Sequence, residues 1–286
     1  MTPEMETIST PPPEVIRRAR RERDFFNRYS DPEKIWDGDL VAPPILNAIP
    51  EEVSHHFPSL QGKYVCEFGC GYGVTSAWFA LRGARVFSFD VAETNVAIAR
   101  RAAKVNNVED LMTVEVMQAE AVALPSNTFD LVFGNAVLHH LDIKISGREI
   151  FRLLKPGGIA IFREPLGENR FLERIRQSTW RSSHHRHTED ERSFRYVDVD
   201  VLRSVFPHLE FRESELLSVL GALLREFKVS PRISPRREKL INQIRQVDRR
   251  MLSKFPFLRP MASYSVVCMF KPNPASMLSS YGEKSA

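Results

Sequence analysis

The decisive stretch of this chain reads Val65-Cys66-Glu67-Phe68-Gly69-Cys70-Gly71-Tyr72-Gly73. A short apolar run that passes into alternate glycines predicts a strand followed by a sharp turn, because glycine has no Cβ to hinder such a turn or a close ligand. In open α/β sheets this turn lies in the crevice where ligands bind. The stretch therefore predicts both a fold class and the position of a site.

The glycine spacing narrows the kind of ligand. A dinucleotide-binding fingerprint has the pattern Gly-x-Gly-x-x-Gly, which would need a glycine at position 74. That position is Val74, and the third glycine is Gly73. No Lys-Ser or Lys-Thr pair follows, so a phosphate-cradling nucleotide loop is excluded as well. The glycine spacing therefore argues against a ligand that contains a pyrophosphate.

Outward from the glycines, short apolar runs alternate with helical segments. We expect strands at residues 63–68, 84–90, 112–117, 129–135, 157–164, 209–216 and 263–271. We expect helices at 74–81, 92–105 and 145–154, with Lys155-Pro156-Gly157-Gly158 as the turn after the last, and a short helix capped by Asp198. Strands separated by such helices predict a parallel sheet covered on both faces, an α/β fold.

The flanking segments differ in character. Residues 1–13 are polar and proline-rich, which predicts a disordered tail, and 273–286 resemble them. Residues 14–60 predict an N-terminal helical cap, and 61–272 the main domain. An insert at about 218–256 ends in a stretch where Leu240, Ile244 and Val247 have amphipathic helical spacing.

Composition and charge exclude several classes. Hydrophobic residues make up 43% and the net charge is +4, so no specific nucleic-acid partner is indicated. No apolar run is long enough to span a membrane, and the N-terminus lacks the apolar core of a secretory signal, so a cytoplasmic location is expected. Three scattered cysteines give no disulfide or zinc pattern, and His184, His185 and His187 have poor metal-ligand spacing, so we expect no metal.

Two carboxylates flank the predicted crevice. Asp90 ends the second expected strand, 17 residues after Gly73, where it can accept hydrogen bonds from both hydroxyls of a ribose. It could instead cap the following helix. Glu67 directly precedes the glycines, where it can face an ammonium group.

Several motifs stand in order along this region. They are Glu67–Gly73, Asp90, Gln118-Ala119-Glu120 with Leu124-Pro125, Phe129-Asp130-Leu131-Val132, Leu138-His139-His140-Leu141 and Leu154-Lys155-Pro156-Gly157-Gly158. As a set they resemble the class I S-adenosylmethionine-dependent methyltransferases, in the branch with quinone-biosynthesis and natural-product enzymes. The resemblance covers about residues 60–165.

This resemblance implies a Rossmann-like sheet of seven strands whose last strand is antiparallel, with the insert as a helical lid. It implies S-adenosylmethionine as cofactor, with Ala119 and Glu120 along the adenine and Asn135 beside the reactive methyl. Gln118 departs from the usual Asp, although its carbonyl oxygen can still accept from the adenine amino group. The predicted cofactor-binding residues are Glu67, Gly69, Cys70, Gly71, Gly73, Asp90, Val91, Gln118, Ala119, Glu120 and Asn135.

Candidates for the chemistry follow the fourth and fifth strands. His139 or His140 could serve as a general base, since histidine titrates near neutral pH. Either could instead pack beneath the loop or bond a backbone carbonyl. Glu164 is expected to point toward the mouth of the site, where it could steer a polar substrate or cap the next turn.

The methyl acceptor is predicted to be a small molecule. Methyltransferases acting on base amines or glutamine usually have Asn or Asp followed by Pro-Pro after the fourth strand, whereas this chain has Asn135-Ala136-Val137-Leu138. The alternatives are a methyltransferase-fold scaffold without activity and methylation of a macromolecule. The oligomeric state is left open.

Overall fold

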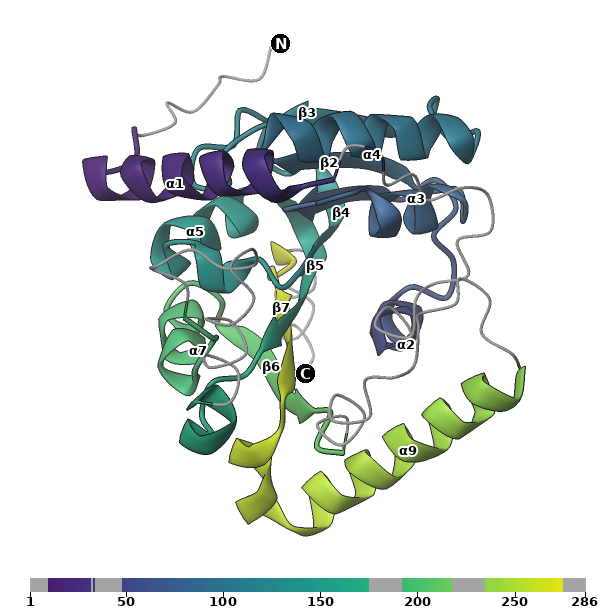
Figure 1. Ribbon diagram of the computed structural model, residues 1–286, viewed down its shortest axis with the longest axis vertical. Coiled ribbons are helices and arrows are strands. Elements are labelled where there is room, and N and C mark those ends of the chain that lie inside the picture. Colours follow the sequence, from purple (N-terminus) through teal and green to yellow (C-terminus); the bar gives the residue numbers. More distant parts are fainter. Residues whose placement is uncertain (1–9, 32, 34–47, 175–191, 218–234, 275–286) are drawn as a thin grey trace, which may run out of the picture.

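The computed structural model describes residues 10–31, 33, 48–174, 192–217 and 235–274. Within them, seven strands form one sheet in the order β3-β2-β1-β4-β5-β7-β6 (Figure 1). β1 to β5 pair in parallel, and β7 runs antiparallel to both β5 and β6. The mostly parallel sheet with an antiparallel last strand is thus confirmed. The strands are β1 (Tyr64–Phe68), β2 (Arg85–Asp90), β3 (Met112–Val116), β4 (Phe129–Asn135), β5 (Leu154–Pro165), β6 (His208–Ser214) and β7 (Tyr264–Phe270).

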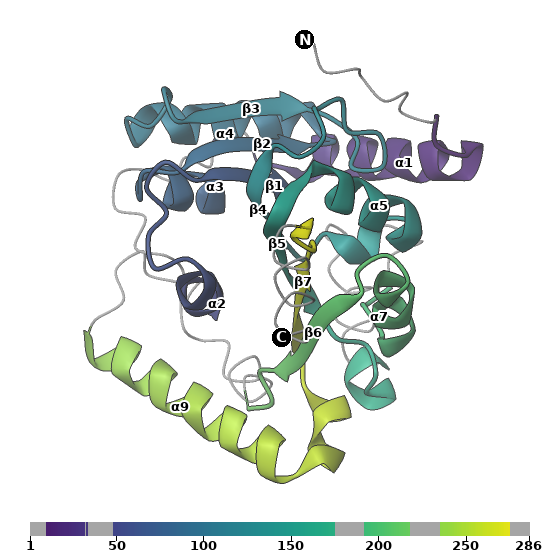
Figure 2. The same cartoon turned by 180° about the vertical axis from the view of Figure 1, so that it is seen from behind.

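Helices cover both faces of this sheet, as the sequence predicts. One face carries α2, α3 and α4, and the other carries α5 and α7 (Figures 1 and 2). Each face has its own apolar core: Phe79 packs with Phe133 on the first, and Phe68 with Phe162 on the second. The helices are α1 (Pro13–Tyr29), α2 (Ala48–His56), α3 (Val74–Ala80), α4 (Glu93–Val105), α5 (Ile143–Leu153), α7 (Tyr196–Arg203) and α9 (Pro235–Lys254), with 3-10 turns η1 (Leu138–His140) and η2 (Pro256–Met261).

The strand order reverses at β1, and this reversal positions the site. β1 pairs with β2 on one side and with β4 on the other, so the chain leaving β1 enters the crevice where the sheet changes direction. α1 is fastened at this edge by polar contacts to α4: Asn27 Oδ1 accepts from the Thr94 N–H, and the Ser30 hydroxyl donates to Asn95.

Two local expectations were wrong. β5 begins at Leu154, not at Gly157, because Leu154 pairs with Phe129 before the register shifts and Leu131 pairs with Ile159. The Lys-Pro-Gly-Gly segment therefore lies within β5 as an irregular stretch, in which Gly157 has a φ of 80°.

Asp198 does not begin its helix. The N-cap of α7 is Arg195, and Asp198 lies three residues further on. Its carboxylate accepts from the Arg195 N–H at 2.9 Å and pairs with the Arg192 guanidinium. The acidic side chain still stabilises the first turn, but as its third residue.

Several predictions fall outside the described residues. These are most of the N-terminal tail, the C-terminal tail after residue 274, the histidine cluster at 184–187 and the first half of the insert, 218–234. α9 provides the helix expected in the second half, while its role as a lid stays a prediction. No helix in the described ranges is both long and apolar enough to cross a membrane.

Candidate active site

The glycine loop turns the chain from β1 into α3. Gly73 adopts φ 76° as the N-cap of α3, and a Cβ there would lie 2.7 Å from the Cβ of Ala99, so only glycine fits between the two helices. Gly71 is different. It also has a positive φ, 51°, but a Cβ there would meet nothing within 4 Å. The backbone at Gly71 therefore faces open space, as a ligand-binding loop requires.

Asp90 accepts three hydrogen bonds, one from this loop and two from the start of α4. Its Oδ2 accepts from the Gly71 N–H at 3.0 Å, and its Oδ1 accepts from the Ala92 N–H at 2.9 Å and from Asn95 Nδ2 at 3.1 Å. Burial raises the pKa of Asp90, and these three donors oppose that shift. A carboxylate offers about four acceptor positions. If Asp90 is also to accept from two ribose hydroxyls, one of its three present donors must move away.

A cavity of about 210 Å³ opens above the loop. Seven of the eleven predicted cofactor-binding residues line it: Gly69, Gly71, Asp90, Val91, Gln118, Ala119 and Glu120. Other parts of its wall are Asn95, Ala136, Val137 and His140, and α1 contributes Ala19, Glu22 and Phe26. The structure thus brings together residues from the ends of four strands, β1 to β4, and places the N-terminal helix over them.

Glu120 joins this wall to α1. Its Oε1 accepts from Arg18 Nη2 at 2.9 Å and from the Asp142 N–H at 3.1 Å, and Gln118 Nε2 donates to its Oε2 at 3.3 Å. The side chain of Glu120 is almost fully buried. Glu120 therefore holds both α1 and the start of α5 against the cavity.

Four predicted cofactor residues do not line the cavity. Glu67 is buried, and its Oε2 accepts from the Ser76 hydroxyl on α3. Burial raises the pKa of Glu67 to about 8. Cys70 and Gly73 lie within the loop itself, and Asn135 Oδ1 accepts from Arg163 Nη1 at 3.2 Å. Their contact with a cofactor stays a prediction.

Glu164 does not point toward the mouth of the site, and that expectation was wrong. The residue is fully buried. Its Oε1 accepts from the Val137 and Leu138 N–H groups at 3.0 and 2.8 Å, and its Oε2 lies 2.7 Å from His139 Nδ1. The carboxylate of Glu164 is thus bound by backbone N–H groups at the start of η1. The side chain of His139 is buried against it.

His140 is the histidine that reaches the cavity. Its Nδ1 lies 3.2 Å from Oε2 of Glu22, a buried carboxylate on α1. Sequence reasoning missed Glu22. Its signal is its spacing from Val15, Ala19 and Phe26, which places a carboxylate on the stripe that α1 turns inward.

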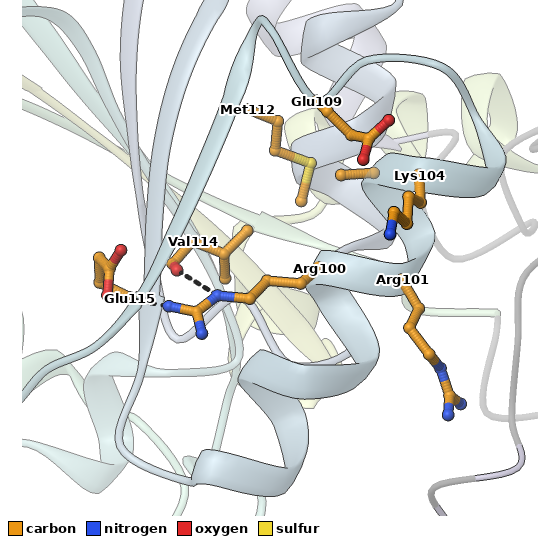
Figure 3. Close-up of a pocket in the computed structure, with 8 residues that line it drawn as sticks. Arg100, Arg101, Lys104, Glu109, Met112, Val114 and Glu115 are labelled. Carbon is orange, nitrogen blue, oxygen red and sulfur yellow. Dashed lines mark hydrogen bonds and ion pairs between the residues drawn. The ribbon is translucent and has the colours of Figure 1, made fainter.

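A larger hollow of about 420 Å³ lies elsewhere, between α4 and the edge strand β3 (Figure 3). Arg100 crosses it, donating to the Val114 carbonyl at 2.9 Å and pairing with Glu115. These contacts cover the open hydrogen-bonding edge of β3. The hollow contains no glycine loop, so we place the site at the smaller cavity. Among the described residues, no group of three or more acidic, histidine or cysteine side chains is arranged to hold a metal.

Comparison with known proteins agrees with this geometry. Residues 66–162 match a family described as "Methyltransferase domain". This part of the chain is therefore similar to methyltransferase domains. It contains the glycine loop, Asp90, the η1 turn and most of β5.

A curated relative of this domain, the ubiquinone biosynthesis O-methyltransferase of Pseudomonas putida, is 36% identical over 133 residues, 44% of this chain and 56% of the relative. The chain thus spans little more than half the length of the curated relatives it matches.

Solved structures share the fold over most of the chain. The geranyl diphosphate C-methyltransferase of Streptomyces coelicolor has a TM-score of 0.57 at 13% identity, covering 92% of this chain and 99% of its own. The [4+2]-cyclase SpnF has a TM-score of 0.53 at 16% identity, covering 91% and 95%. A methyltransferase and a cyclase on one fold show that the fold alone does not decide the reaction.

Proposed function

We propose that this protein binds S-adenosylmethionine at the glycine loop and transfers its methyl group to a small-molecule acceptor. The observation that carries the proposal is the cavity above Gly71, where backbone without a Cβ, the Asp90 carboxylate and the Gln118–Glu120 segment meet. The match of residues 66–162 to methyltransferase domains supports it, as do the curated relatives, which are named O-methyltransferases.

The residues present suit this cofactor. Asp90 can accept from a ribose hydroxyl, and Gln118 and Ala119 lie on the segment expected along the adenine. The loop from Gly69 to Gly73, with Glu67 and Asn135 next to it, would hold the methionine part. The same seven cavity-lining residues, with Glu67, Cys70, Gly73 and Asn135, remain our proposed cofactor site.

The protein's part in the reaction is to bind, orient and exclude water. The bound cofactor supplies an electrophilic methyl carbon. The protein must hold an acceptor atom at near-attack distance, about 3–3.5 Å, in line with the bond that breaks. Ala19 and Phe26 of α1 cover the cavity with apolar groups that keep bulk water out.

The proposed acceptor is small, and the support for this is local. After β4 the chain continues Asn135-Ala136-Val137, without the polar Pro-Pro segment typical of enzymes that methylate base amines. α1 also closes directly over the cavity, leaving about 210 Å³. A duplex or a folded protein could not approach this site unless α1 moved away.

The test is cofactor binding by calorimetry in wild type, Gly71→Arg and Gly62→Arg. Both glycines have a positive φ, 51° and 71°, and neither has an atom within 4 Å of its Cβ position. Arginine therefore strains the backbone equally at both. Gly62 precedes β1 at the opposite end of the strand, so only Gly71→Arg fills the cavity.

We expect Gly71→Arg to weaken binding at least 100-fold and Gly62→Arg to leave it unchanged. Equal affinity in all three proteins would refute the site. A folded wild type that binds neither S-adenosylmethionine nor its demethylated product would refute the function and favour a scaffold role.

A further inference from the structure

Arg163 is a buried arginine near the end of β5, beside the strand that leads into the cavity wall. It is 3% exposed and pairs in register with Asn135, the last residue of β4. Its Nη1 donates to Asn135 Oδ1 at 3.2 Å, its Nε donates to Glu215 Oε1 at 3.1 Å, and its Cζ lies 3.5 Å from the centre of the Tyr264 ring. Arg163 is thus held by three side chains, one of which is Asn135.

The contact with Arg163 decides which way the amide of Asn135 points. An arginine side chain can only donate hydrogen bonds, so the amide atom that faces it must be the oxygen. The Nδ2 group therefore points away from Arg163. Asn135 is partly exposed, and no residue that the structure describes accepts a hydrogen bond from its Nδ2. The end of β4 thus offers a hydrogen-bond donor to a ligand.

Arg163 also holds two backbone positions in an unfavourable conformation. Four described residues other than glycine have a positive φ, and two of them are asparagines, which adopt it more readily than most. The other two are Ala136, at 54°, and Glu215, at 64°. Both are bound to Arg163: its carbonyl oxygen accepts from the Ala136 N–H at 2.7 Å, and its guanidinium pairs with Glu215. Such conformations persist where neighbours enforce them, and they cluster at active sites.

The sheet face that carries Asn135 also carries Glu67. Glu67 of β1 pairs in register with Phe133, and side chains two residues apart along a strand share a face. Ala136, the residue after Asn135, lines the cavity. The methionine part of the proposed cofactor has one ammonium and one carboxylate group. Glu67 is the residue predicted to face the ammonium, so a donor at Asn135 is complementary to the carboxylate.

We propose that Arg163 is a positioning residue, which orients Asn135 so that its Nδ2 group donates to the carboxylate of the cofactor's methionine part. The inference rests on the proposed function and deepens it, because it assigns a partner to one group of the ligand. In this role Arg163 need not contact the cofactor. It acts through the amide of Asn135 and through the backbone of Ala136, which forms part of the cavity wall.

The first test is calorimetry with two ligands, S-adenosylmethionine and decarboxylated S-adenosylmethionine, in wild type and Asn135→Asp. Aspartate keeps an oxygen for Arg163 but replaces the donor by a second anionic oxygen. We expect Asn135→Asp to bind S-adenosylmethionine at least about 10-fold more weakly, the usual loss for a hydrogen bond to a charged group. Its affinity for the decarboxylated ligand and its Tm should not fall. An equal loss for both ligands, or no loss for either, would overturn the assignment.

The second test asks whether Arg163 acts through Asn135. Arg163→Met should weaken S-adenosylmethionine binding about 10-fold, and Arg163→Lys, which keeps a donor, should recover part of the loss. Asn135→Ala should weaken binding less in the Arg163→Met background than in wild type, because the amide is no longer oriented. Arg82→Met is the control, since Arg82 also lies over an aromatic ring, that of Trp78 at 3.9 Å. Additive losses at Arg163 and Asn135, or an equal loss in Arg82→Met, would show a merely structural role.

A measurement without ligand separates this inference from the proposed function. The side-chain amide ¹⁵N signal of Asn135 should shift in Arg163→Met and stay in place in Arg82→Met. A signal that does not move in Arg163→Met would overturn the positioning role. A folded protein that binds neither ligand would refute the proposed function and the carboxylate assignment together, and the amide signal would still test the link between Arg163 and Asn135.

Discussion

Glu67 shows how one residue can link the site to the stability of the fold. Its carboxyl group is buried beside Ser76, and burial raises its pKa from the ordinary value of 4.5 to about 8. Between these values the folded protein holds a proton that the unfolded chain releases. The free energy of unfolding must therefore fall as pH rises across this window, by at most about 1.4 kcal/mol per pH unit from this group.

We expect Glu67→Gln to flatten the pH dependence of stability between about pH 5 and 8, because the amide imitates the protonated acid. Urea unfolding at several pH values measures this, and Glu115→Gln, at an exposed position paired with Arg100, is the control. A wild type and a Glu67→Gln variant with parallel pH profiles would show that Glu67 is ionised in the fold.

The residues near the glycine loop were predictable because their signals are local. Gly71 and Asp90 follow directly from strand ends and spacing. Glu164 was not predictable: a residue at a strand end has several possible partners, and here the N–H groups of Val137 and Leu138 captured it. The contact between Glu22 and His140 depends on where α1 docks. The spacing of residues along the chain gives no information about that position.

At the scale of elements, α1 acts as the cover of the cavity. It is fastened along its length: Arg18 pairs with Glu120, Asn27 contacts Thr94, and Ser30 contacts Asn95, which in turn donates to Asp90. The position of α1 over the cavity is therefore linked through Asn95 to Asp90, the carboxylate expected to bind ribose. We therefore expect α1 to move when a ligand the size of S-adenosylmethionine enters or leaves the cavity.

We expect Arg18→Ala to raise the dissociation rate of S-adenosylmethionine several-fold, because Arg18 fastens the middle of α1 to the cavity wall. Stopped-flow displacement measures the rate. Arg23→Ala is the matched control, since Arg23 pairs with its exposed neighbour Asp24. Equal rates in all three proteins would mean that α1 does not limit release.

Among the elements, most strands and helices of the sheet were predicted to within two residues. The central strands β1 and β4 were among the most closely predicted, because burial on both faces produces continuous apolar runs. The exception is β5. Its irregular start at Leu154 depends on pairing with Phe129 in the neighbouring strand, and a Lys-Pro-Gly-Gly segment read by itself indicates a turn.

At the scale of the whole molecule, two apolar cores lie on opposite faces of one sheet, and the site lies at the edge where they meet. Phe68 ends β1 in one core, while Phe79 of α3 is buried in the other, so the glycine loop connects both. A ligand that bridges this loop, Asp90 and α1 should therefore stabilise the entire fold rather than one segment.

We expect S-adenosylmethionine at 100 times its dissociation constant to stabilise the folded state by about 2.7 kcal/mol. For a domain of this size that corresponds to a rise in Tm of roughly 5–10 °C. Scanning calorimetry should show one transition that moves as a whole in wild type and in Gly62→Arg, and no shift in Gly71→Arg. NAD⁺ is the control ligand, because the third glycine stands at position 73 and not at 74. An equal shift with NAD⁺ would contradict the specificity inferred from that spacing, and a second transition that ignores the ligand would show that the two cores unfold separately.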